Sequence, residues 1–177
     1  GMGGAIKLAK ELAEKNGYFL PMQFDNPANA LIHEQTTGQE ILRAFGADLP
    51  DAFVAGVGTG GTLTGVGRAL RAKKADIQVY ALEPSESPVL KEGKKAGFVP
   101  SILDTKLYDD ILEVPSQKAL EMAREVGKNE GFLPGISAGA NIYGAIEVAK
   151  KLGAGKRVLT VAPDNGERYL STELFEG

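Results

Sequence analysis

The sequence predicts an α/β protein with a mostly parallel open sheet and helices on both of its faces. The apolar run at 52–55 and the mostly apolar runs at 77–82 and 157–162 suit strands that are buried in a sheet. Segments with apolar residues at helical spacing separate these runs, and this alternation is typical of a parallel sheet. At 177 residues, the chain is long enough for one α/β domain with its own core.

The N-terminal part of the chain is expected to be mostly helical. Apolar residues at helical spacing mark an amphipathic helix over 6–15, and the apolar residues 18–20 predict a short strand. A helix from Ala30 is expected to break and restart. Thr37 and Glu40 lie three residues apart and form a capping box for the second helical piece.

A polar loop at 23–29 lies between the short strand and the helix from Ala30. In open α/β sheets, ligands bind at loops that follow the carboxyl ends of strands, so this loop is a candidate site. The step from Asn26 to Pro27 is equally typical of a plain turn in which Asn29 caps the next helix. Spacing alone leaves both interpretations open.

The chain is organised around the stretch 52–71, in which a buried strand, a glycine-rich loop and a helix follow one another. Glycine lets the backbone approach a ligand closely, and free N–H groups at the start of a helix favour an anion. The alternative is a turn that only packs helix against strand. We predict a phosphate site formed by Gly58, Thr59, Gly60, Gly61 and Thr62.

The same stretch also fits a dinucleotide-binding fingerprint, because Gly56, Gly58 and Gly61 have the required spacing. The strand at 77–82 ends in Glu83, where an acid that binds ribose belongs. A nicotinamide-cofactor domain is therefore an open alternative on these residues alone. A P-loop is excluded because no lysine follows the last glycine.

Beyond Glu83, strands and helices continue to alternate. An irregular turn at 84–88 and a basic surface loop at 91–95 precede a strand at 111–114. Ser116 is placed to cap a helix over 117–129.

A second small-residue loop, Gly135–Asn141, follows a short predicted strand at 132–133 and enters another helix. Ser137 lies at or near the N-cap of that helix, which is typical of a capping serine. The apolar run 157–162 then forms a buried strand with a third loop at its carboxyl end. A tail helix over 169–175 is expected to close the chain.

The bulk composition excludes several classes of site and partner. A net charge of −3 and a pI near 5.3 argue against nucleic acid or an anionic membrane. The sequence has no cysteine, which excludes disulfides and thiolate sites, and its single histidine, His33, is interpreted as structural. We therefore predict no metal site. No apolar run of membrane length and no signal peptide are visible, so a cytoplasmic protein is expected.

Five stretches of the sequence form one set, and together they cover nearly the whole chain. Their order and spacing resemble the cysteine synthase family, also called O-acetylserine sulfhydrylase, whose members are fold-type II pyridoxal-phosphate enzymes. The glycine loop alone is weakly specific, whereas the set is strongly specific. The stretches are Gln23–Asn29, Gly56–Thr62, Glu83–Leu90, Gly135–Ala140 and Asn165–Thr172.

The resemblance implies a role for each matching residue. The Gly58–Thr62 loop would hold the phosphate of pyridoxal 5′-phosphate, in the large cofactor-binding domain of the family. Ser137 would hydrogen-bond the pyridine nitrogen, and a neutral hydroxyl there favours β-elimination. Gln23 would help to bind the substrate carboxylate. The family eliminates acetate from O-acetyl-L-serine and adds sulfide, which gives L-cysteine.

The chain also departs from the family pattern. The family's Schiff-base lysine lies in a Ser-x-Lys-x-Arg motif, and the nearest match, Ser116-Gln117-Lys118, opens a predicted helix. A Thr-Ser-Gly-Asn loop that binds the substrate carboxylate is missing as well. The chain therefore resembles only the C-terminal portion, a single partial domain over 1–177 without a catalytic residue. Residues 1–20 would be the remnant of a junction, and the Gly93–Gly97 segment is shorter than in the family.

Four candidate functions are consistent with these sequence features. The leading one is cysteine synthase, for which the resemblance implies small-molecule substrates, a homodimer and serine acetyltransferase as a partner. A relative similar to cystathionine β-synthase, or one that uses phosphoserine, shares the same motifs. The others are a non-catalytic scaffold chain that binds a partner and the nicotinamide-cofactor domain.

Overall fold

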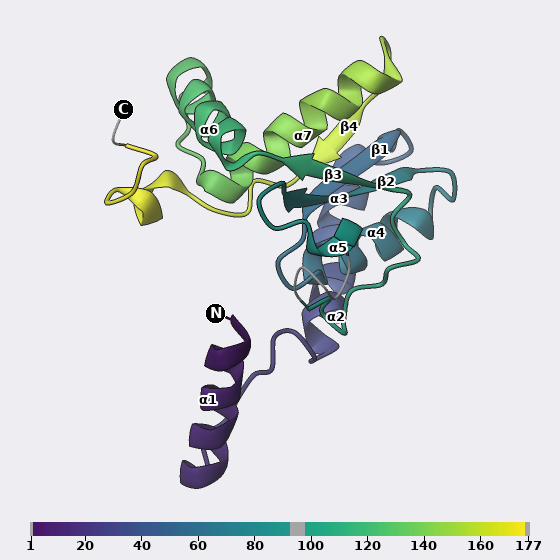
Figure 1. Cartoon of the computed structure of the whole chain (residues 1–177). Helices are drawn as coiled ribbons and strands as arrows, with labels where there is room; N and C mark the ends of the chain where they lie inside the picture. The colour runs from purple at the N-terminus through teal and green to yellow at the C-terminus, as the bar shows by residue number, and fades with distance from the viewer. Residues whose placement is uncertain (1, 93–97, 176–177) are drawn as a thin grey trace.

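The computed structural model describes residues 2–92 and 98–175, and it confirms the predicted fold class (Figure 1). Four parallel strands form one open sheet in the order β3-β2-β1-β4. The strands are β1 (Ala52–Gly56), β2 (Gln78–Pro84), β3 (Asp110–Val114) and β4 (Val158–Thr160). The helices are α1 (Met2–Asn16), α2 (Ala28–Gln35), α3 (Thr37–Phe45), α4 (Gly61–Arg71), α5 (Val89–Glu92), α6 (Ser116–Glu130), α7 (Ile136–Leu152) and the 3-10 turn Gly166–Tyr169.

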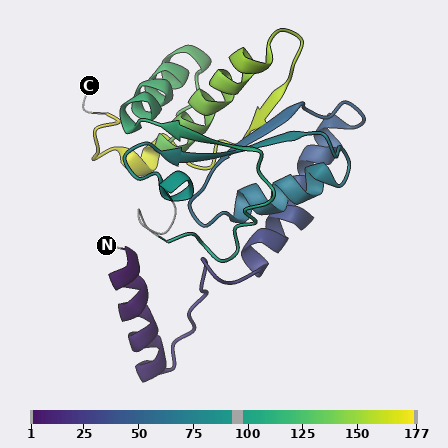
Figure 2. The same cartoon turned by 45° about the vertical axis from the view of Figure 1, so that its right-hand side comes forward.

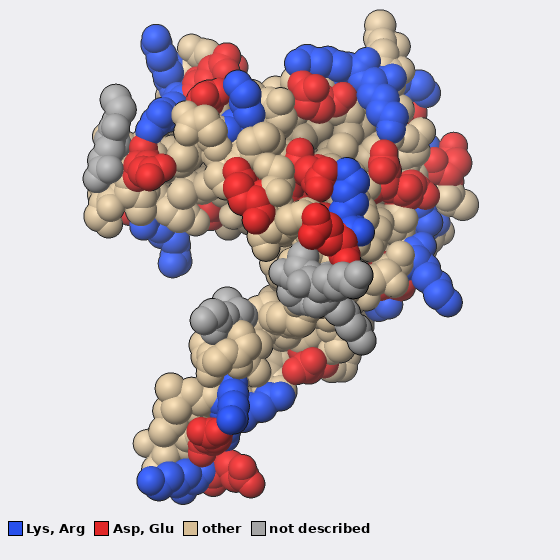
Figure 3. Space-filling model, in the orientation of Figure 1, with Lys and Arg blue, Asp and Glu red and all other residues tan. Residues whose placement is uncertain are grey.

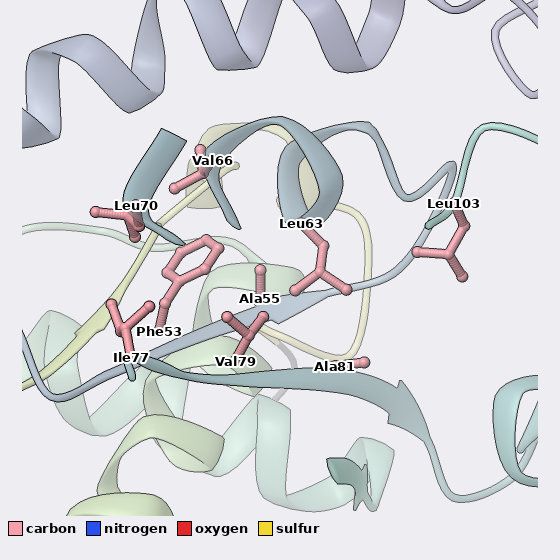
Figure 4. Close-up of a cluster of buried hydrophobic side chains, with 9 residues drawn as sticks. All are labelled: Phe53, Ala55, Leu63, Val66, Leu70, Ile77, Val79, Ala81 and Leu103. Carbon is pink, nitrogen blue, oxygen red and sulfur yellow. The ribbon is translucent and has the colours of Figure 1, made fainter. Parts of the chain in front are cut away.

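One face of the sheet is covered by α4, with α2 and α3 packed against it (Figures 1 and 2). Side chains three or four residues apart on α4 share a face, and Leu63, Val66 and Leu70 point toward the sheet (Figure 4). They pack on Phe53, which is fully buried. Burial of such a side chain stabilises the fold by roughly 2–3 kcal/mol.

The opposite face is covered by α6 and α7. Side chains alternate along a strand, so Val54, next to Phe53, points to this second face. There it packs in a cluster with Tyr80, Ala145 and Val148. The two clusters explain why the apolar runs at 52–55 and 79–82 are continuous rather than alternating.

Two predicted short strands and the predicted tail helix are wrong. Residues 18–20 form no ladder with any described residue, since α1 and the segment after it stand away from the sheet (Figures 1 and 2). Phe132–Leu133 is irregular, and the next residue, Pro134, makes only an isolated bridge with Asn165. In place of a helix over 169–175, the chain continues from the 3-10 turn into further turns.

Two predicted helix caps are also wrong. The break between α2 and α3 lies at Thr36, while Thr37 is inside α3 and its hydroxyl contacts His33 instead of capping the helix. Ser116 is the first residue of α6, and both its N–H and its hydroxyl donate to the carboxylate of Glu86. In both cases a side chain from another segment competes with the local cap.

The basic loop predicted at 91–95 begins inside a helix, since Lys91 belongs to α5. Glu92 belongs to the same helix, while the remainder of that loop and the shortened Gly93–Gly97 segment lie outside the described residues. Basic and acidic side chains are intermixed on the face that Figure 3 shows. None of the helices in the described chain is both long and apolar enough to cross a membrane.

Candidate functional site

A cavity of about 370 Å³ opens at the carboxyl ends of the strands. It lies where the strand order reverses, because the chain passes from β1 to β2 on one side while β4 lies on the other. Its walls come from three strand ends and from the first residues of α4 and α7. The lining residues are Gly56, Val57, Gly58, Thr59, Gly60, Gly61, Thr62, Leu82, Pro84, Ser137, Ala140, Asn141 and Pro163.

The glycine loop lines this cavity, and several of its N–H groups have no acceptor among the described residues. Gly60 has a φ of 85°, in the left-handed region that favours glycine. Among the described residues, the backbone N–H groups of Thr59, Gly60 and Thr62 have no acceptor. The first N–H groups of a helix lack partners within it, and the helix dipole favours negative charge there. These groups are therefore free to bind an anion.

Asn29 ties the 23–29 loop to the glycine loop. Its Nδ2 atom donates to the carbonyl oxygen of Gln23 at 2.8 Å and to Thr59 Oγ1 at 3.0 Å. Asn29 does not cap α2, which begins one residue earlier at Ala28. Thr59 Oγ1 also accepts the N–H of Gly61 at 3.3 Å, so its own hydrogen stays available for the cavity.

Gln23 is the one predicted site residue that the structure places elsewhere. Its exposed side chain lines a separate groove with Ile6 and Ala9 of α1. Only its carbonyl is connected to the cavity, through Asn29. The proposed contact with a substrate carboxylate therefore stays a prediction.

The side chain of His33, on α2, contacts Thr62 on α4 and Thr37 on α3, and so connects three helices. Its Nε2 atom is 3.2 Å from Thr62 Oγ1, and its Nδ1 atom is 3.1 Å from Thr37 Oγ1. Burial lowers the pKa of His33 below its ordinary value, so the imidazole is neutral near pH 7. In the tautomer with hydrogen on Nε2, the ring donates to Thr62 and leaves the Thr62 hydroxyl free to donate to an anion. Sequence reasoning missed this support because 29 residues separate the two side chains.

Ser137 lines the same cavity from the start of α7, as its predicted role requires. It is not the N-cap, because Gly135 holds that position. The N–H groups of Ser137 and Ala138 donate to the carboxylate of Asp164 at 3.2 and 2.7 Å. Tyr169 donates its hydroxyl to the same carboxylate at 2.6 Å, and this bond raises the pKa of Tyr169. Sequence reasoning noted the loop at 163–168 but missed that Asp164 caps α7.

Glu83 is not available for a ribose. Its side chain is 3% exposed, and its two carboxylate oxygens accept the N–H groups of Leu90 and Lys91 at 2.6 and 3.0 Å. The carboxylate therefore holds the start of α5. The nicotinamide-cofactor interpretation depended on Glu83 as the acid that binds ribose, and this carboxylate already accepts two backbone N–H groups.

No lysine is found among the described residues that line the cavity. Lys118, the nearest match to the lysine motif, lies on α6, and its Nζ atom is paired with Glu121 at 2.8 Å. The described residues also contain no group of three side chains that could hold a metal ion.

A family model described as "Pyridoxal-phosphate dependent enzyme" matches residues 1–164. The chain belongs to this family. It is 55% identical over 183 residues to a cysteine synthase from Staphylococcus aureus (strain Mu50 / ATCC 700699), a match that covers 98% of this chain and 59% of the relative. The predicted resemblance to cysteine synthase is confirmed.

Solved structures of the family superpose closely on this chain. An O-ureido-L-serine synthase gives a TM-score of 0.93 at 43% identity, over 98% of this chain and 58% of that one. A cysteine synthase from Entamoeba histolytica gives a TM-score of 0.90 at 37% identity, over 100% of this chain and 55% of that one. The chain thus spans about three-fifths of the length of the relatives it matches.

The residues around the cavity fit the cofactor of this family. The glycine loop and two threonine hydroxyls offer donors for a phosphate, and no carboxylate among the described lining residues would repel it. Leu82, Pro84 and Ala140 supply apolar walls for a ring. The hydroxyl of Ser137 is a neutral partner for an aromatic nitrogen.

Proposed function

We propose that this chain forms the phosphate- and ring-binding part of a pyridoxal-phosphate-dependent cysteine synthase. The reaction would replace the acetate of O-acetyl-L-serine with sulfide and give L-cysteine. One observation supports the proposal: the glycine loop, whose N–H groups lack acceptors among the described residues, and Ser137 at the start of α7 line one cavity. The 55% identity to a cysteine synthase supports the choice of reaction.

Each site residue has one task in this proposal. Gly58, Thr59, Gly60, Gly61 and Thr62 hold the phosphate with N–H groups and two hydroxyls. Ser137 donates to the pyridine nitrogen without protonating it. When bound, pyridoxal phosphate supplies an electron-withdrawing ring that stabilises negative charge on the substrate's α-carbon. Gln23 is proposed for the substrate carboxylate on the resemblance to the family alone, since its backbone is tied to the glycine loop through Asn29 but its side chain lines a separate groove.

Calorimetric titration of the 177-residue chain with pyridoxal phosphate, and separately with sulfate, tests this assignment. We expect one saturable site for each, with competition between the two ligands, since both would use the glycine loop. A matched variant, K118A, changes an exposed lysine on α6 and should bind like the parent. Absence of binding by the parent chain, or binding without competition, contradicts the proposal.

The proposal also implies that these 177 residues alone make no cysteine. The chemistry needs a lysine that bonds to the cofactor and moves the α-proton, and none lines the described cavity. Incubation with pyridoxal phosphate, O-acetylserine and sulfide should yield no cysteine above the level without protein. Cysteine formation, together with a borohydride-trappable bond to one lysine such as Lys118 or Lys94, would contradict this expectation.

For a protein with the full length of these relatives, we propose cytoplasmic location, a homodimer and association with serine acetyltransferase. These proposals rest on the similarity to cysteine synthases. Sedimentation of such a protein, with and without purified serine acetyltransferase, measures both assemblies. A monomer that does not co-sediment contradicts them.

A further inference from the structure

Asn141 is a buried polar residue for which the proposed function has no role. It lies on α7, one turn after Ser137, and is 3% exposed. Its Oδ1 atom accepts the N–H of Gly56 at 2.8 Å, and its Nδ2 atom donates to the carbonyl oxygen of Val161 at 2.8 Å. The amide thus bridges the carboxyl ends of β1 and β4.

The two groups that Asn141 bridges are the two that would otherwise bond to each other. In the ladder between β1 and β4, the N–H of Ala52 donates to the carbonyl of Arg157. Hydrogen bonds in a parallel ladder repeat every two residues along each strand. Four residues further along both strands, the same pattern pairs the N–H of Gly56 with the carbonyl of Val161. The side-chain amide of Asn141 therefore occupies the place of one rung of the ladder.

The other edge of β1 shows the contrast. Toward β2, pairing continues past Gly56, since the N–H of Val57 donates to the carbonyl of Leu82 at 2.8 Å. Toward β4, the ladder ends at Val54 and Thr160. The strands therefore separate at the point where the cavity lies, and Asn141 lines that cavity.

We propose that Asn141 is a positioning residue that keeps the ends of β1 and β4 apart, and so sets the place of the glycine loop relative to Ser137. The choice of pyridoxal phosphate as the ligand rests on the proposed function, whereas the separation of the two strand ends by Asn141 does not. Without the amide, the N–H of Gly56 and the carbonyl of Val161 pair directly, and the crevice narrows next to the loop. A Cβ on Gly56 would lie 2.9 Å from Asn141 Oδ1, so the close approach also requires glycine.

Two variants and one control test this inference in the 177-residue chain. N141A allows the strand ends to pair, whereas N141L has nearly the shape of asparagine and holds them apart without hydrogen bonds. The control is T64V. Thr64 lies on α4, the helix that follows the glycine loop, but it does not line the cavity. Its hydroxyl accepts a hydrogen bond from the N–H of Asp104, which valine cannot accept. Couplings measured by NMR across hydrogen bonds identify the acceptor of Gly56 N–H, and titration gives the affinity for pyridoxal phosphate.

In the parent chain, we expect coupling from Gly56 N–H to the side chain of Asn141. In N141A, we expect coupling to the carbonyl of Val161 and about tenfold weaker binding of pyridoxal phosphate. Binding by T64V, and by N141L if it folds, should stay within about threefold of the parent, equal to ~0.7 kcal/mol. N141A affinity within twofold of the parent, or equal weakening in T64V, overturns the inference. If the parent binds no pyridoxal phosphate, the proposed function fails, and the spacer role is then decided by the coupling alone.

Discussion

Two helices begin at the cavity, α4 and α7, and the N–H groups at their first residues differ in whether they already have an acceptor. At the start of α4, the N–H groups of Gly60 and Thr62 have no acceptor among the described residues. At the start of α7, the N–H groups of Ser137 and Ala138 are bonded to the carboxylate of Asp164. The positive end of one helix dipole is open to a ligand, and that of the other is neutralised from within the chain. An anion is therefore directed to α4, while α7 offers only a hydroxyl.

Gly61 and Gly135, at the starts of the two helices, have the same structural role. A Cβ on Gly61 would overlap Oδ1 of Asn29, and a Cβ on Gly135 would overlap the carboxylate of Asp164. In both loops, glycine makes room for a side chain from a distant segment. The difference lies in that side chain, because the amide of Asn29 orients Thr59 at the open site, whereas the carboxylate of Asp164 fills the other.

Substitution of Gly61 should have the largest effect, because it breaks the open helix start. In G61A, the new Cβ would also lie 2.6 Å from Asn29 Cγ, so the Asn29 side chain must move away from Thr59. We expect a loss of about 1–3 kcal/mol in the free energy of unfolding, typical of overpacking. Pyridoxal phosphate affinity should fall at least tenfold. Urea unfolding and calorimetric titration measure the two effects.

The matched control is G58A, since a Cβ on Gly58 would meet nothing within 4 Å and its φ is not positive. Its free energy of unfolding should stay within about 0.5 kcal/mol of the parent. Equal destabilisation of both variants would show that the approach of Asn29 does not matter.

Removal of the Asp164 carboxylate should make the start of α7 resemble that of α4. D164A loses two N–H bonds and the bond from Tyr169, so we expect a loss of about 1–2 kcal/mol in the free energy of unfolding. We also expect a second, weaker sulfate site. Y169F removes only one of the three bonds and serves as the control. A single sulfate site in D164A, seen by titration, would count against the neutralising role of Asp164.

These contrasts show what sequence reasoning reached and what it could not. The strand at 52–55 and the helix after it were predictable, because burial and helical spacing are local patterns. The shared cavity of Gly60 and Ser137 followed from a resemblance of motif sets, and the structure brings both residues together. Two partners of the site residues lie far away in the sequence: Asp164 is 27 residues from Ser137, and His33 is 29 residues from Thr62. No local pattern encodes such distant hydrogen bonds.

A smaller effect is expected from Thr62, which adds one hydroxyl to the open helix start. T62A should weaken pyridoxal phosphate binding by about 1 kcal/mol, or roughly fivefold, the net value of one hydrogen bond. T62S keeps the hydroxyl and should bind within about twofold of the parent. Titration of both variants tests whether the hydroxyl or the methyl group of Thr62 is responsible.

The imidazole of His33, in contact with Thr62, should make the stability of the chain depend on pH. The pKa of His33 in the folded chain lies below its ordinary value of 6.5, so the unfolded chain binds the proton more readily. Stability should therefore fall as the pH decreases through 6.5 toward the lowered pKa. Urea unfolding from pH 7.5 to 5.5 should show a steeper loss in the parent than in H33Q. Equal slopes would mean that His33 titrates alike in both states.

The smallest effect on anion binding is expected from the substitution of Ser137. This variant tests most directly whether the anion binds at the start of α4 and not at the start of α7. The start of α7 is already neutralised by Asp164, so S137A should bind sulfate within about twofold of the parent, a change of ~0.4 kcal/mol. Pyridoxal phosphate carries the ring nitrogen that sulfate lacks, and its affinity should fall by about 1 kcal/mol for one lost hydrogen bond. The same calorimetric titration with both ligands separates the two roles. Equal weakening of sulfate and pyridoxal phosphate would place the anion at α7 as well, and the division of labour between the two helix starts would then be wrong.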